Sequence, residues 1–210
     1  MEQRPEICRK HRICVICEGF EDYAYFTRLT ELGVWNSVYH FNLINAKSAS
    51  NIPARFQNAY QNDRDEIILI FCDTDKTPYK EYAKVKRKIN EFLDKRKAAE
   101  KIVIFANPCT MQIILLHFGE VSLKNQGKKT NSSVIEKWTG VKNYDAHEDQ
   151  IREICQKIFQ SSYQDMRNRV AMINKPDIES SSSNFIVFLQ RFENEDNEWI
   201  EKINKYLQEK

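Results

Sequence analysis

The sequence has no long hydrophobic stretch and no strong net charge of either sign. No run among its 210 residues approaches the roughly 18 apolar residues that a membrane-spanning helix needs. The first residues, MEQRPEICRKHR, contain no apolar core of the kind found in secretory signal peptides. We therefore expect a cytoplasmic protein without a membrane partner. The formal net charge of +2 neither indicates nor excludes a nucleic-acid-binding surface, because local clustering of basic residues matters more than the sum.

Two further absences narrow the chemistry. The chain contains no GxxxxGK[ST] phosphate-binding loop, so it carries no P-loop ATPase site of its own. Its six cysteines include Cys8, Cys14 and Cys17, which together with His11 have a spacing that resembles a zinc site. The residues around Cys14 and Cys17 predict a strand, however, and an extended strand directs these two side chains to opposite faces. We therefore interpret Cys14, Cys17 and Cys72 as small buried hydrophobes.

The strongest structural signal is the stretch of residues 67–72, in which no residue is charged and no polar alternation breaks the apolar run. This pattern is typical of a central strand covered on both faces in a parallel sheet. Asp73 and Asp75 follow at its C-terminal end, where open α/β sheets place their functional sites. Two carboxylates so close together repel each other, and a hard cation would offset the repulsion. A turn in which one aspartate caps a helix is the simpler alternative.

Apolar runs and helical periodicity alternate through the first half of the chain. Expected strands cover residues 13–17, 38–44, 67–72 and 102–106, and expected helices cover residues 21–33, 48–60, 79–97 and 111–118. Four such repeats in about 110 residues predict an α/β fold with a central, mostly parallel four-stranded sheet flanked by helices. We assign residues 1–120 to this α/β domain and residues 121–210 to a helical C-terminal extension packed on it.

The extension begins with a polar and basic segment. Residues 122–133 include Lys124, Lys128 and Lys129 around Gly127, and we expect an exposed loop there. Both a solvated connection and a strip of phosphate contacts fit this composition. Expected helices follow at residues 134–138, 146–163, 166–173, 184–192 and 199–207, with the serine run at 180–183 capping the fourth of these.

Glu18 follows the first expected strand at the same end as Asp73 and Asp75. If the two strands are neighbours, their ends lie about 5 Å apart, since that is the interstrand spacing. Three carboxylates would then meet at one edge, a cluster that suits Mg²⁺, or Mn²⁺ in its place. Such an ion favours phosphoryl transfer or phosphodiester cleavage, with Glu18 as a ligand or a proton acceptor.

The motifs VICEG at residues 15–19 and FCDTD at residues 71–75 resemble the signature of TOPRIM domains, which occur in topoisomerases, bacterial primases and nucleases of phage defence. A more particular resemblance is to the RloB-like family of small TOPRIM proteins. It rests on Asn107-Pro108-Cys109 followed by Leu-Leu-His-Phe at residues 115–118, and on the serine-containing stretch at residues 175–189.

This resemblance implies a TOPRIM-like Rossmannoid fold and a Mg²⁺-dependent nuclease that acts on DNA or RNA in antiviral defence. By the same resemblance, Glu18, Asp73 and Asp75 are the metal-binding and catalytic residues, and a separately encoded ATPase is a partner. Phosphate contacts are assigned to the lysines that flank these motifs and occupy the basic segment, namely Lys76, Lys124, Lys128 and Lys129.

One departure from the family pattern leaves other functions open. RloB-like proteins usually place Phe-Glu after the Asn-Pro-Cys turn, whereas this chain has Thr110 and Met111. The alternative is therefore a catalytically weakened TOPRIM module that binds nucleic acid or an ATPase partner without cleaving. A third hypothesis is a sheet that serves a small phosphorylated ligand. We interpret His117, a polar residue on an apolar helix, as a core histidine with satisfied hydrogen bonds.

Overall fold

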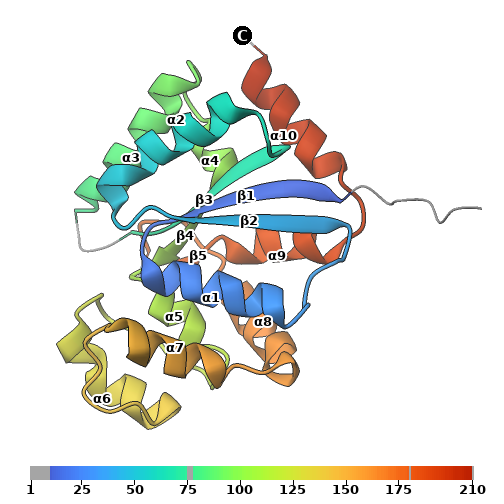
Figure 1. Cartoon of the computed structure of the whole chain (residues 1–210). Helices are drawn as coiled ribbons and strands as arrows, with labels where there is room; N and C mark the ends of the chain where they lie inside the picture. The colour runs from blue at the N-terminus through green and yellow to red at the C-terminus, as the bar shows by residue number, and fades with distance from the viewer. Residues whose placement is uncertain (1–9, 75–77, 180, 210) are drawn as a thin grey trace, which may run out of the picture.

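A five-stranded sheet with helices on both faces forms the centre of the molecule (Figure 1). The computed structural model describes residues 10–74, 78–179 and 181–209. The strands are β1 (His11–Cys17), β2 (Tyr39–Asn45), β3 (Ile67–Asp73), β4 (Val103–Asn107) and β5 (Ser182–Ser183). They lie in the order β2-β1-β3-β4-β5, and all pairs are parallel except β4 with β5. The predicted α/β class and mostly parallel sheet are confirmed, with one strand more than expected.

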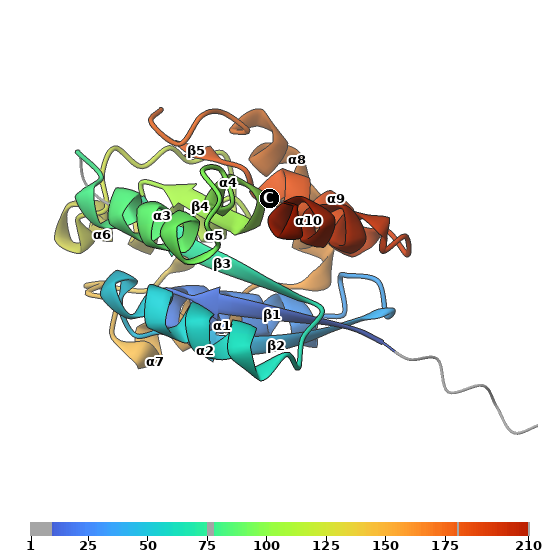
Figure 2. The same cartoon turned by 90° about the horizontal axis from the view of Figure 1, so that it is seen from above.

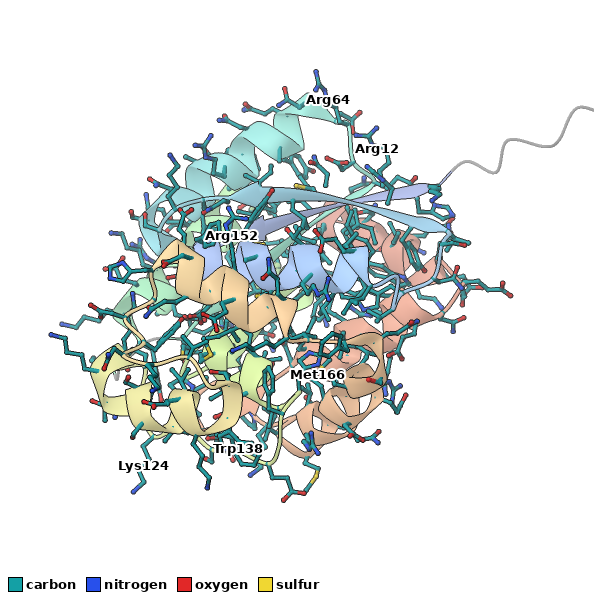
Figure 3. The ribbon with its side chains drawn as sticks, turned by 60° about the horizontal axis from the view of Figure 1, so that its bottom comes forward. Arg12, Arg64, Lys124, Trp138, Arg152 and Met166 are labelled. Atoms are coloured by element: carbon teal, nitrogen blue, oxygen red, sulfur yellow. The ribbon has the colours of Figure 1, made fainter. Side chains whose placement is uncertain are left out.

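The helices form two layers against the sheet and a third layer beyond one of them. Their bounds are α1 (Phe20–Glu31), α2 (Ile52–Asn62), α3 (Lys80–Phe92), α4 (Ala99–Ile102), α5 (Thr110–Leu115), α6 (Lys128–Thr139), α7 (Glu148–Gln156), α8 (Tyr163–Met172), α9 (Phe185–Glu193) and α10 (Glu198–Gln208), with 3-10 turns η1 (Ala49–Asn51) and η2 (Gln160–Ser162). Helices α2 and α3 cover one face, and α1, α5 and α9 cover the other (Figure 1). Helix α7 contacts α1, and α6 contacts α5, as an outer layer (Figure 3).

The additional strand comes from the C-terminal part of the chain. Ser182 and Ser183 pair with the end of β4, at the edge of the sheet opposite β2 (Figure 2). The Ser183 hydroxyl donates to the Phe105 carbonyl at 2.6 Å, and the Asn184 side chain accepts from the Phe105 amide at 2.9 Å. Ser183 Oγ also accepts from the amide of Phe185 at 3.0 Å, at the start of α9. The serine run therefore joins the sheet as well as starting a helix, and Ser180 lies outside the described residues.

Residues of the C-terminal part also complete the main core. Phe185 and Phe192 of α9 are fully buried. The ring of Phe185 stacks on Phe71 of β3 with a centroid separation of 5.4 Å, and it lies 5.8 Å from the ring of Phe26. Helix α9 thus shares one hydrophobic core with β3 and α1, because its aromatic side chains cover the face that α1 leaves open.

Three predicted segments differ from the structure. The expected helix 79–97 ends at Phe92, because Asp94 adopts a left-handed conformation with φ of 49°. The expected helix 146–163 ends at Gln156. The expected loop 122–133 is partly helical, since α6 begins at Lys128. Hydrogen bonds start that helix: Asn125 Oδ1 accepts from the amide of Gly127 at 2.8 Å, and its carbonyl accepts from Asn131 Nδ2 at 2.7 Å. Among the described residues, no helix is both long and apolar enough to cross a membrane.

Candidate active site

The C-terminal ends of β1 and β3 bring two of the predicted carboxylates together. The two strands are neighbours in parallel register, with Cys17 opposite Phe71. The pairing continues one residue further, because the amide of Glu18 donates to the Phe71 carbonyl at 3.0 Å. Glu18 Oε2 in turn accepts from the amide of Asp73 at 3.1 Å. Glu18 and Asp73 therefore lie side by side, whereas Asp75 and Lys76 lie outside the described residues.

Two carboxylates that the sequence analysis did not single out join this pair from the first turn of α1. Asp22 is only 3% exposed, and its Oδ2 accepts from the amide of Gly19 at 2.8 Å, which caps the start of the helix. Glu21 accepts a short hydrogen bond from the hydroxyl of Tyr144. Acidic residues are common in the first turn of a helix, because they favour the positive end of its dipole. The two adjacent acids, Glu21 and Asp22, are visible in the sequence, but stabilisation of the helix start alone is enough to explain them.

Thr110, at the start of α5, links Asp73 to Asp22. Its amide and its hydroxyl lie 2.7 and 2.9 Å from Oδ1 of Asp73, and its hydroxyl also makes a short hydrogen bond with Oδ1 of Asp22. A threonine hydroxyl has a single proton and can donate to only one of the two carboxyl groups. A proton on the other carboxyl group, donated to Thr110, would satisfy the second contact.

The raised pKa values of the cluster agree with a proton held on one of these carboxyl groups. Burial raises the pKa of Asp22 to about 7, although hydrogen bonds from Thr110 and Gly19 oppose the shift. Burial also raises the pKa of Asp73 well above its usual range, and the charges of Asp22, Glu18 and Glu21 raise it further. Burial raises the pKa of Glu21 as well, against the hydrogen bond from Tyr144 and the charge of Lys128. Cations or protons are needed to hold these four acids together.

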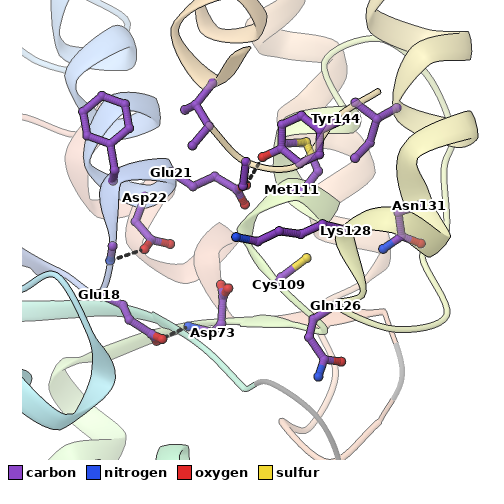
Figure 4. A pocket seen from close by; sticks show the side chains of 15 residues that line it. Glu18, Glu21, Asp22, Asp73, Cys109, Met111, Gln126, Lys128, Asn131 and Tyr144 are labelled. Atoms are coloured by element: carbon purple, nitrogen blue, oxygen red, sulfur yellow. Dashed lines mark hydrogen bonds between the residues drawn. The ribbon is translucent and has the colours of Figure 1, made fainter. Parts of the chain in front are cut away.

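The four carboxylates line a solvent-open hollow of about 250 Å³ (Figure 4). The remaining lining comes from α1, α5, α6, α7 and the segments between them: Gly19, Phe20, Cys109, Met111, Gln126, Lys128, Asn131, Ile135, Tyr144, Ala146 and Ile151. Lys128 extends from the first turn of α6 into the hollow and points toward the carboxylates (Figure 4). Met111 is almost completely buried and forms part of the wall.

The predicted phosphate-binding lysines do not act as one group. Lys124, Lys128 and Lys129 are all exposed, but only Lys128 of these three lines the hollow. Lys124 points away from the body of the protein (Figure 3). Within residues 10–74, 78–179 and 181–209, no group of three or more histidine, cysteine, aspartate or glutamate side chains is arranged to hold a metal ion. The proposed third ligand, Asp75, does not belong to those ranges.

His117 lies outside the hollow, and both of its ring nitrogens have hydrogen-bond partners. Its Nε2 is 3.0 Å from the Tyr25 hydroxyl, and its Nδ1 is 2.9 Å from Ser162 Oγ. Burial, together with the charge of Arg169, lowers the pKa of His117 to about 3, so the ring is neutral near pH 7. The interpretation of His117 as a core histidine with satisfied hydrogen bonds is confirmed.

Comparison of the chain with known protein families, with curated proteins and with solved structures finds no significant match. The resemblance to RloB-like TOPRIM proteins therefore stays a hypothesis that rests on the motifs themselves. What the site can do has to be argued from its own geometry.

Proposed function

We propose that the protein is a Mg²⁺-dependent nuclease that hydrolyses phosphodiester bonds in DNA or RNA. The observation that carries this proposal is the meeting of four carboxylates, Glu18, Glu21, Asp22 and Asp73, in one solvent-open hollow at the C-terminal ends of neighbouring parallel strands. Parallel α/β sheets bind their ligands at this edge. Uncompensated carboxylates are costly to bury together, and a divalent cation offsets that cost.

All four acidic side chains offer oxygen atoms, which are the ligands that Mg²⁺ and Mn²⁺ accept. Within the described residues no three of them are arranged to hold an ion, so the proposed site needs a further ligand. Both hydrogen bonds to the Asp73 carboxylate from described residues go to Oδ1, so Oδ2 is available to an ion. Glu18 and Asp73 would hold the ion, with Asp75 as the third ligand that the resemblance implies. When bound, the ion would polarise a phosphate group and lower the pKa of a coordinated water.

The protein's own residues would position the substrate and move a proton. Lys128 faces the carboxylates across the hollow, where its ammonium group would bind a non-bridging phosphate oxygen. Asp22 would accept the proton of the attacking water, because it lines the hollow together with Glu18 and Asp73. Thr110 would keep Asp22 and Asp73 at a fixed separation, since it contacts both.

The motif resemblance supports the same proposal from an independent side. Glu18 of VICEG follows β1 and Asp73 of FCDTD ends β3, which matches the strand-Glu-Gly and strand-Asp-x-Asp arrangement that the resemblance implies. From this resemblance we further propose a cytoplasmic role in antiviral defence and a separately encoded ATPase as partner.

A cleavage assay tests the proposal. The purified protein is incubated with supercoiled plasmid, single-stranded DNA and RNA, each with Mg²⁺, Mn²⁺ or EDTA. We expect metal-dependent cleavage of at least one substrate, its loss in Asp73→Asn, and its retention in Asp63→Asn, an exposed aspartate at the end of α2. Cleavage that persists in EDTA, or in Asp73→Asn at the wild-type rate, would contradict the proposed chemistry.

A second candidate function is a module that binds nucleic acid or an ATPase partner without cleaving. It is favoured by one observation: Met111 forms part of the wall beside the carboxylates, at the position where the resemblance implies a glutamate. A thioether cannot replace a carboxylate toward Mg²⁺. Binding of nucleic acid that is unaffected by EDTA, with no cleavage under any metal condition, would support this function over the nuclease.

A further inference from the structure

The hollow has two chemically different halves. One half consists of the four carboxylates at the ends of β1 and β3 and in the first turn of α1. The other half is formed by apolar side chains from four helices and the segment before α7. We call these apolar lining residues the base compartment and define it by Phe20, Met111, Ile135, Tyr144, Ala146 and Ile151.

A metal ion does not need the base compartment. Mg²⁺ binds its oxygen ligands at about 2.1 Å, so an ion on the carboxylates would fill a small part of the hollow of about 250 Å³. Water is poorly held in apolar surroundings, because it finds few hydrogen-bond partners there. An apolar wall beside an ion and phosphate site is better suited to an organic group that is attached to the phosphate.

Amide groups with unused hydrogen-bonding capacity also line the hollow. Asn131 donates from Nδ2 to the Asn125 carbonyl at 2.7 Å, and in the described part of the chain its Oδ1 has no hydrogen-bond partner. The side-chain amide of Gln126 makes no hydrogen bond to any described residue. Both residues line the hollow. Together they offer donors and acceptors next to apolar walls, which is the combination that binds a planar heterocycle.

We propose that the base compartment takes one nucleobase of a single-stranded nucleic acid, while the adjoining phosphate lies between Lys128 and the carboxylates. This inference rests on the proposed function and names its substrate class. A nucleobase has flat apolar faces and a polar edge, which match the walls and the two amides. The bases of a duplex are stacked and paired, and each would have to be flipped out to enter. Single strands, loops and ends are therefore the preferred substrates.

Two contacts of the wall residues hold the compartment in shape. The Tyr144 hydroxyl donates to Glu21, which ties one wall to the acidic half. The guanidinium of Arg152, outside the hollow, lies 4.7 Å from the centre of the Phe20 ring. A preformed compartment binds a base at lower entropic cost than one that must first be ordered.

Calorimetric titration tests the compartment without relying on cleavage. Adenosine 5′-monophosphate and ribose 5-phosphate are each titrated into the full chain in the presence of Mg²⁺. We expect the nucleotide to bind at least about tenfold more tightly, the order expected when one base stacks on a protein surface. Ala146→Trp should fill the compartment and abolish the difference, because Ala146 lines the hollow and is only partly buried. Ribose 5-phosphate should bind this variant within twofold of wild type.

Two further variants keep the test decisive. Ala146→Leu fills the compartment with a smaller side chain, in case tryptophan disturbs folding, and Ala171→Trp adds the same ring at an exposed site on α8 as a control. Equal affinities of the two ligands for the wild type, or no binding of either, would overturn the proposal. So would a folded Ala146→Leu variant that binds the nucleotide as the wild type does.

The outcome separates this inference from the nuclease proposal. A base-dependent affinity without any cleavage would contradict the nuclease and leave the compartment supported. Mg²⁺-dependent cleavage together with equal affinities would contradict the compartment and leave the nuclease supported.

Discussion

Two polar clusters each contain a residue of α1 and a residue of the segment 110–117, and they differ in how their charges are compensated. The acidic cluster consists of Glu18, Glu21, Asp22, Asp73 and Thr110. The histidine cluster consists of Tyr25, His117 and Ser162. Asp22 and Tyr25 are one helical turn apart on α1, so the contrast arises over a short distance.

The two clusters show burial acting in opposite directions on charge. In the histidine cluster, burial lowers the pKa of His117, and a neutral ring with a partner on each nitrogen results. In the acidic cluster, burial raises the pKa of Asp22 and Asp73, but there are more acids than one shared proton can neutralise. The first arrangement is complete within the protein, and the second needs a ligand. We therefore place function in the acidic cluster.

The largest expected effect is a difference in cleavage activity between variants of the two clusters. If the acidic cluster is catalytic, Glu18→Gln should lower kcat by about 100-fold or more, since loss of a group that stabilises transition-state charge typically costs that much. His117→Gln should change kcat by less than about threefold, because His117 lies outside the hollow. Initial rates of cleavage with Mg²⁺ in excess measure both. Equal losses in the two variants would show that the clusters do not differ in function.

The second prediction concerns acid stability of the histidine cluster. The pKa of His117 is about 3 in the folded state, below its ordinary value of 6.5, so the folded state disfavours the protonated ring. Its contribution is fully present above pH 6.5 and is lost as the pH falls toward 3. At pH 5 the loss is about 2 kcal/mol, at 1.36 kcal/mol per pH unit. The His117→Gln variant has no imidazole ring to protonate, so it should not show this loss of stability.

Urea unfolding of wild type and His117→Gln at pH 7 and pH 5 measures the effect. The free energy of unfolding of the wild type should fall relative to the variant by about 2 kcal/mol between these pH values. Comparison with the variant removes the contribution of the acidic cluster, which is present in both. Parallel pH profiles for the two proteins would mean that the ring is not held neutral.

The third prediction concerns the acidic cluster, where the free energy of unfolding should fall as the pH rises, opposite to the effect of His117. The pKa of Asp22, about 7, lies above its ordinary value of 3.8, so ionisation of Asp22 destabilises the fold increasingly as the pH rises from about 4 to 7. Asp22→Asn removes that charge and still offers an oxygen to Gly19 and an amide donor to Thr110. We expect this variant to be more stable than wild type at pH 8 in EDTA, by up to about 4 kcal/mol at 1.36 kcal/mol per pH unit.

Metal and pH provide the controls for this variant. At pH 4 the advantage of Asp22→Asn should disappear, because the wild-type carboxyl is then protonated. Mg²⁺ at pH 8 should reduce the advantage, since a cation compensates the wild-type charge. A variant less stable than wild type under all these conditions would show that Asp22 acts mainly as a helix cap.

The comparison of the clusters also shows what could be predicted from the sequence. The apolar runs of β1 and β3 predicted that Glu18 and Asp73 would meet, because parallel neighbours end at one edge. Glu21 and Asp22 were missed, since their first-turn position is equally expected of acids that only stabilise a helix. Whether they face a hollow depends on how α5, α6 and α7 pack against α1, which the local pattern does not contain.

A similar reason explains the missed strand and the misplaced loop. Strand β5 has only two residues. It forms because the side chains of Ser183 and Asn184 hydrogen-bond to the backbone of Phe105 in β4, which is distant in the sequence. Helix α6 starts where Asn131 Nδ2 donates to the Asn125 carbonyl and Asn125 Oδ1 accepts from the amide of Gly127, rather than where apolar periodicity begins. Both depend on side-chain hydrogen bonds, which hydrophobic patterns do not report.

The smallest expected effect distinguishes Lys128 from its neighbour. Lys128 points into the hollow, whereas Lys129 is exposed and lies outside its lining. Lys128→Ala should raise KM for a single-stranded substrate by about three- to tenfold, since one phosphate contact is lost. Lys129→Ala should leave KM within about twofold of wild type. Because Lys128 and Mg²⁺ are both cations near the same carboxylates, Lys128→Ala should strengthen Mg²⁺ binding while it weakens substrate binding. An unchanged KM together with a lower free energy of unfolding would make Lys128 a structural counter-ion rather than a phosphate ligand.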